Sequence, residues 1–140
     1  MLGITDKVRT LWTAYRRSLK RPPHLEARPW EIRCLNHLDE TIWAVPWASI
    51  RKIAAFKRDE ISTDLICWEI EFDAGDGPGL VEIHEELVGF QDVVDEALRR
   101  KMADPKWVSL VMQPAFATCW TVIYDSSVSN PTSVDPAGAC

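Results

Sequence analysis

The chain has 140 residues, of which 46% are hydrophobic and 26% are charged. This length suits one folded domain, and the composition excludes wholesale disorder, collagen-like repeats and a membrane-embedded bundle. No apolar run approaches the roughly 18 to 20 residues that cross a bilayer, and the first residues lack the pattern of a signal peptide. We therefore expect a soluble, cytoplasmic, single-domain protein.

The formal net charge of −5 is unevenly distributed along the chain. Residues 1–28 contain seven basic and two acidic side chains, whereas residues 29–140 contain nine basic and nineteen acidic ones. Phosphate binding needs clustered cations, so the acidic part argues against nucleic acid as a partner. For the basic part, an anionic partner stays open.

Residues 1–22 have the pattern of a basic amphipathic helix. Apolar side chains recur there at steps of three and four, which places them on one helical stripe: Val8, Leu11, Trp12, Tyr15 and Leu19. Its basic side chains are Lys7, Arg9, Arg16, Arg17, Lys20 and Arg21, and the pair Pro22–Pro23 ends it. We favour packing on the domain or on a partner protein; the alternative is an anionic membrane surface.

Several strands follow the two prolines. In residues 30–36, Trp30, Ile32 and Cys34 alternate with polar residues, which predicts a half-buried strand. A turn over 36–40 leads to a second strand at 41–45, which Pro46 interrupts. The apolar residues of segment 47–59 follow neither the spacing of a strand nor that of a helix, and we interpret the segment as a strand with an irregular start.

The second half begins with the clearest strand, residues 64–72, in which Glu69 and Glu71 should point outward. Three glycines and one proline in residues 73–79 predict a turn into a paired strand at 79–86. An apolar stripe predicts a helix from residue 89 to 102. Pro114 divides residues 107–124 into a short helix or turn and a strand, and residues 126–140 have the composition of a flexible tail.

This order of elements predicts an α+β fold: an N-terminal helix, an antiparallel sheet curled into a partial barrel, an amphipathic helix that closes it, and a disordered C-terminal tail. The expected units are the basic helix (1–22), the α+β domain (23–125) and the tail (126–140). The segments VPWASIRKI, TDLICWEIEF and VEIHEELVGFQDVVDEAL resemble the pleckstrin-homology-like superfamily, particularly small bacterial members, over residues 30–102. That resemblance implies a non-catalytic scaffold that presents loops and sheet edges to proteins or lipid headgroups. The turn NHLDET at residues 36–41 is acidic, which speaks against phosphoinositide binding.

The sequence contains no motif of a catalytic or cofactor site. GxSxG, HExxH and GxxxxGKS are absent, and the cysteines at 34, 67, 119 and 140 are too scattered for a metal knuckle. We therefore predict no catalytic residue, no cofactor and no metal. An acid–base site of Asp64, Glu82 and His84 is the enzyme alternative, because the two strands that carry them should pair.

Protein binding is the function that these observations favour. The expected binding residues are two tryptophans beside Pro46 and three carboxylates of the acidic edge: Trp43, Trp47, Asp64, Glu82 and Glu85. The acidic residues 29–140 would attract a basic protein, as an inhibitor of the immunity type attracts its toxin. Lys7, Arg9, Trp12, Arg16, Arg17 and Lys20 are the expected contacts to a second partner or to an anionic membrane.

Overall fold

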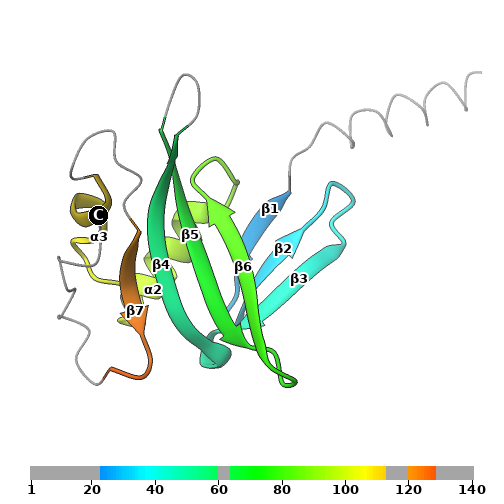
Figure 1. Ribbon diagram of the computed structural model, residues 1–140. Helices are drawn as coiled ribbons and strands as arrows, with labels where there is room; N and C mark the ends of the chain where they lie inside the picture. Colours follow the sequence, from blue (N-terminus) through cyan, green and yellow to red (C-terminus); the bar gives the residue numbers. More distant parts are fainter. Residues whose placement is uncertain (1–22, 60–63, 113–119, 129–140) are drawn as a thin grey trace, which may run out of the picture.

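The computed structural model describes residues 23–59, 64–112 and 120–128 (Figure 1). These residues form an α+β fold, as predicted, with strands β1 (His24–Ala27), β2 (Glu31–Leu35), β3 (Thr41–Pro46), β4 (Ile50–Asp59), β5 (Asp64–Asp73), β6 (Pro78–His84) and β7 (Thr121–Asp125), and with helices α2 (Phe90–Arg99) and α3 (Trp107–Met112). None of these helices has the length and apolar character needed to cross a bilayer. The predicted helix at residues 1–22 and the tail beyond residue 128 lie outside the described residues.

The strands form two antiparallel sheets. One has the order β1-β2-β3 and the other the order β6-β5-β4-β7. The chain passes from the first to the second at Pro46, which has no N–H for a ladder hydrogen bond, and through a 3-10 turn at Trp47–Ser49. The expectation of one curled sheet was therefore wrong, because the irregular start predicted after Pro46 is the break between two sheets.

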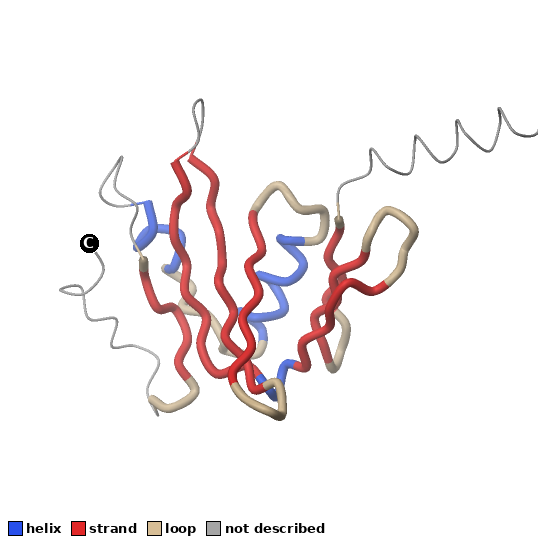
Figure 2. Tube along the Cα trace, turned by 45° about the vertical axis from the view of Figure 1, so that its right-hand side comes forward, coloured by secondary structure: helices blue, strands red, loops and turns tan. Residues whose placement is uncertain are grey.

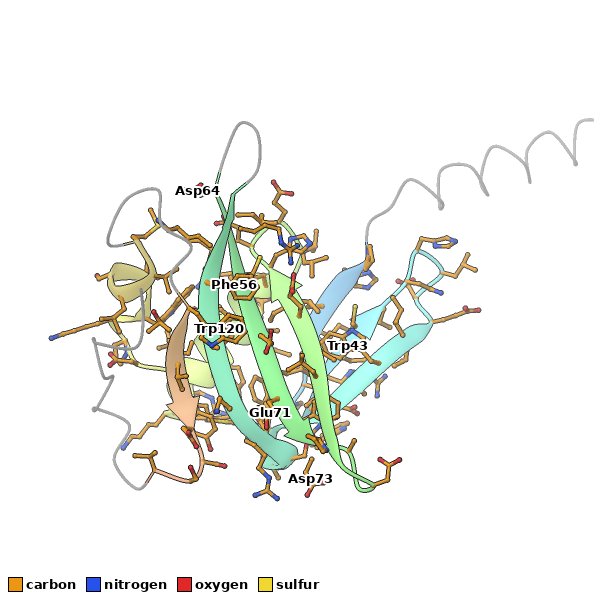
Figure 3. All side chains as sticks on the ribbon, in the orientation of Figure 1. Trp43, Phe56, Asp64, Glu71, Asp73 and Trp120 are labelled. Atoms are coloured by element: carbon orange, nitrogen blue, oxygen red, sulfur yellow. The ribbon has the colours of Figure 1, made fainter. Side chains whose placement is uncertain are left out.

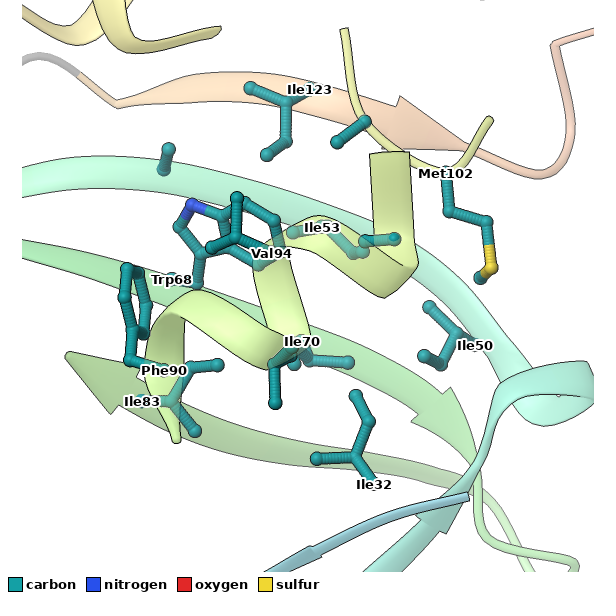
Figure 4. Close-up of a cluster of buried hydrophobic side chains, with 14 of the residues drawn as sticks. Ile32, Ile50, Ile53, Trp68, Ile70, Ile83, Phe90, Val94, Met102 and Ile123 are labelled. Carbon is teal, nitrogen blue, oxygen red and sulfur yellow. The ribbon is translucent and has the colours of Figure 1, made fainter. Parts of the chain in front are cut away.

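Helix α2 lies between the two sheets and covers one face of the four-stranded sheet (Figure 2). On that face, Trp68 and Ile70 of β5 are fully buried. The Trp68 ring makes an edge-to-face contact with Phe90 of α2, at 5.8 Å between centroids (Figure 4). A second edge-to-face contact, at 5.1 Å, joins Trp68 to Trp107 of α3. The predicted amphipathic helix is therefore present and packs on one face of the four-stranded sheet, but it does not close a curled sheet, because the strands form two separate sheets.

The three-stranded sheet is joined to the rest of the domain at its β1 edge. The backbone N–H of Leu25 donates a hydrogen bond of 2.7 Å to the Val88 carbonyl, in the connection between β6 and α2. A parallel bridge links His24 to the same residue, Val88. The start of β1 therefore lies beside the C-terminal end of β6.

The tryptophans around Pro46 lie differently from their predicted positions. Trp47 is buried, its Nε1 donates a hydrogen bond of 2.8 Å to the Arg28 carbonyl, and the Arg100 guanidinium lies 5.0 Å from its ring centroid. Trp30, expected on the buried face of its strand, is 61% exposed, because β2 begins one residue later and Trp30 belongs to the preceding turn. Trp47 is thus a core residue and Trp30 a surface residue.

Candidate functional site

The side of the four-stranded sheet that faces away from α2 is the candidate site, and we call it the outer face. Successive strand residues point to opposite sides, so Cys67, Glu69 and Glu71 lie opposite to the buried Trp68 and Ile70. Cross-strand partners share a face, and the register therefore gives three rows across β4, β5 and β6. The rows are Phe56–Cys67–His84, Ala54–Glu69–Glu82 and Lys52–Glu71–Leu80. Both described helices pack on the other side, with Phe90 and Trp107 against Trp68.

Apolar groups occupy both lateral parts of the outer face. The Phe56 ring stacks on Trp120, which precedes β7, with 5.1 Å between centroids and an interplanar angle of 17° (Figure 3). Trp120 is 42% exposed, and Leu80 on β6 is 59% exposed. The smaller Ala54 and Cys67 between them are buried. The face thus combines a packed centre with two large apolar groups in contact with solvent.

Carboxylates dominate the half of the outer face that β5 and β6 form. These two strands contain five Asp or Glu residues and no Lys or Arg. Glu69 lies directly opposite Glu82, and Glu71 lies two residues further along β5. Burial, together with the neighbouring Glu82 and Glu71, raises the pKa of Glu69. A positive charge placed over this half would therefore be attracted to it.

The basic groups of the outer face lie on the β4 side. Lys52 is opposite Glu71, and Arg58 forms an ion pair with Glu82 across the strand between them. Near the start of β4 and the end of β5, Arg51 forms an ion pair with Asp73 at 3.1 Å. The hydrogen bonds that Asp73 accepts from Gly75 and Arg51 lower the pKa of its carboxyl group. Charge on the face is therefore divided, with the excess of carboxylates on β5 and β6.

The predicted acidic cluster is spread along the hairpin instead of gathered. Asp64 begins β5 opposite Asp59, whereas Glu82 pairs with Glu69, five residues further along the strand. At about 3.3 Å per residue, Asp64 and Glu82 are about 16 Å apart. The backbone of Glu85 pairs with that of Ile66, and its carboxylate accepts a hydrogen bond of 2.9 Å from the Ile66 N–H. Glu85 therefore closes the end of the β5–β6 ladder.

An acid–base site of Asp64, Glu82 and His84 needs these groups within hydrogen-bond reach of one substrate. The separation of Asp64 from Glu82 does not provide this, although His84 and Glu82 share the outer face. In the described part of the chain, no group of three or more His, Cys, Asp or Glu side chains is arranged to hold a metal ion. What the outer face offers chemically is apolar contact area beside an excess of carboxylates on β5 and β6, of which Glu82 is paired with Arg58.

Two further predicted residues lie away from the outer face. Trp43 is half-buried on β3, opposite Cys34 of β2, and Trp47 is in the core. Sequence reasoning missed Phe56, Leu80 and Trp120, because their positions on one face depend on the pairing of β4 with β7 and β5 with β6. The signal that was available is the outward position of Glu69 and Glu71, which the structure confirms. The basic residues expected as contacts in 1–22 lie outside the described residues.

Comparison with known proteins gives no assignment, since no family model, no curated protein and no solved structure matches the chain.

Proposed function

We propose that this chain is a non-catalytic protein-binding module whose outer face binds a basic protein. The observation that carries the proposal is the composition of the β5–β6 half of that face. Three carboxylates, Glu69, Glu71 and Glu82, lie on the same face as the exposed Leu80. The two strands that carry these residues contain no Lys or Arg. Interfaces commonly join an apolar anchor to a polar rim, and this half of the face has both.

The electrostatics of Glu69 support a cationic partner. Its raised pKa means that the folded chain disfavours the ionised form at that position. A lysine or arginine from a partner would reverse this cost by supplying an opposite charge close to the carboxylate. Strand positions that cost stability in the free protein are expected where binding depends on them.

The net charge of residues 29–140 also favours a basic partner, and it acts at longer range. Residues 29–140 contain ten more acidic than basic groups. A field of this sign accelerates encounter with a basic partner, as with an immunity-type inhibitor and its toxin. The likeness to a pleckstrin-homology-like scaffold enters the proposal only through the α+β fold with α2 packed on the inner face of the four-stranded sheet, since the two separate sheets do not form one curled sheet.

The test compares three tagged proteins in affinity capture from native extract. The face variant is Glu71→Lys with Leu80→Ala; the control variant, Glu40→Lys with Leu38→Ala, makes the same two changes at exposed residues outside the four-stranded sheet. We expect a stoichiometric basic protein with the wild type and the control, and at least tenfold less with the face variant. Equal capture by all three proteins, or recovery of each chain alone, would contradict the proposal.

A further inference from the structure

We infer that the chain's own residues 5–20 dock on the β5–β6 half of the outer face, as an internal occupant that a basic partner must displace. The inference rests on the proposed function, because both use the same face. Four observations support it: complementary charge, a matching apolar stripe, matching length and the position of the tether.

Charge and apolarity match on the two sides. Residues 5–20 contain five basic side chains, Lys7, Arg9, Arg16, Arg17 and Lys20, and the apolar stripe that includes Leu11 and Trp12. The β5–β6 half presents Glu69, Glu71 and Glu82 beside the exposed Leu80. A basic amphipathic helix laid on this surface would cover the leucine with its stripe and place its cations over the carboxylates.

The lengths agree as well. Sixteen residues of α-helix extend about 24 Å, and the seven residues of β6 extend about 23 Å. A helix of this size covers the hairpin from one end to the other without a large overhang.

The tether places the segment at the correct end of the hairpin. His24 forms a bridge with Val88, four residues beyond the end of β6 at His84. Because β1 lies on the α2 side of the four-stranded sheet, residues 21–23, about 10 Å of extended chain, would lead around the edge strand β6 to the outer face. The C-terminal part of the segment then lies over Glu82, and its N-terminal part runs toward Glu71 and the turn before β6. Arg16 and Lys20, which flank the apolar stripe, meet the first of these regions, and Lys7 and Arg9 meet the second.

Hydrogen–deuterium exchange of the full chain at low salt tests the inference, with exchange of residues 5–20 as the readout. We expect amides of this segment to exchange at least tenfold more slowly in the wild type and in the Glu40→Lys/Leu38→Ala control than in the Glu71→Lys/Leu80→Ala variant. Adding Lys7→Glu and Arg9→Glu to the face variant should restore slow exchange, since these cations are placed over Glu71.

Three results would overturn the inference: fast exchange in the wild type, slow exchange that the face variant leaves unchanged, or slowing that requires added phosphatidylglycerol vesicles. Slowing that requires these vesicles would identify an anionic membrane as the surface to which residues 5–20 bind. If exchange is fast in the wild type while capture of the basic protein still depends on the face, the inference fails and the proposed function stands. If neither measurement depends on the face, both fail.

Discussion

Replacement of Gly89 by alanine tests how the two sheets are joined. Gly89 precedes α2 with φ of +91°, and a Cβ built there would lie 2.0 Å from the Leu25 carbonyl oxygen. Contacts of real Cβ atoms are essentially never below 3.0 Å, so the two backbones must separate by about 1 Å. That movement would strain the hydrogen bond between Leu25 and Val88, which links β1 to the connection before α2.

The expected loss in the free energy of unfolding is the sum of two contributions. A left-handed backbone costs a non-glycine residue about 1–2 kcal/mol, and the strained hydrogen bond adds about 1 kcal/mol. Gly75 is a matched control, since its φ is +94° and nothing lies within 4 Å of its Cβ position. We expect Gly75→Ala to lower the free energy of unfolding by about 1–2 kcal/mol and Gly89→Ala by about 2–3 kcal/mol.

Urea unfolding followed by tryptophan fluorescence measures both values, because Trp68 and Trp107 are buried in the core. A Gly89→Ala variant that loses no more stability than Gly75→Ala would contradict this expectation. The close contact between β1 and the start of α2 would then contribute nothing to the stability of the domain.

Three further predictions concern stability and pH. Ile70→Ala removes a fully buried side chain on the face of β5 that α2 covers, and it should lower the free energy of unfolding in urea by about 2–5 kcal/mol. Ile42→Ala, at a position that is 53% exposed, should lower it by less than about 1 kcal/mol. Similar losses for the two variants would argue against the assigned inner face. Hydrogen bonds from Arg99 and Arg100 lower the pKa of Glu96 from 4.5 to about 2, so the unfolded chain binds a proton that the folded chain does not, and stability should fall as the pH drops through this window. Unfolding midpoints at pH 6 and pH 3 should differ less for Glu96→Gln than for the wild type, and a parallel fall in both would count against these ion pairs. The raised pKa of Glu69 has the opposite sign, because its ionisation in the folded chain costs stability as the pH rises; Glu69→Gln should therefore raise the urea midpoint at pH 7, and an unchanged or lower midpoint would show that the carboxylate is not under strain.

Much of the local structure follows from hydrophobic period. The hairpin of β5 and β6 and the helix α2 were predicted because the apolar residues of their buried faces recur at steps of two, or of three and four. A short helix or turn followed by a strand was also predicted in residues 107–124, and these elements are α3 and β7. Each of these elements carries its signal within its own residues.

The remaining features depend on contacts between distant residues. β1 has only four residues, His24–Ala27, and is held by β2 and by Val88, so it has no local signal long enough to recognise. Trp47 is buried because its indole N–H reaches the Arg28 carbonyl, 19 residues away. The division into two sheets likewise depends on which strands pair after Pro46, and alternation within a strand carries no information about its neighbours.

The candidate site shows the same limit. Glu69 and Glu71 were expected to point outward from their alternation, and they do. The stack of Phe56 on Trp120 joins residues 64 positions apart and forms only because β7 pairs with β4. Leu80 faces the same side because β6 pairs with β5 in the register that places it opposite Glu71. The carboxylates of the face were accessible to sequence reasoning, and its apolar groups were not.

Zero-length carbodiimide cross-linking in native extract tests whether the outer face binds a basic protein, because it joins carboxylates only to amines in contact with them. We expect intermolecular links to lysines of a basic protein to map to Glu69, Glu71 and Glu82 on the outer face. Glu26 and Glu40, which lie on or beside the three-stranded sheet, serve as internal references. Links confined to Glu26 and Glu40, with the outer-face carboxylates unmodified by any partner, would contradict binding at the outer face.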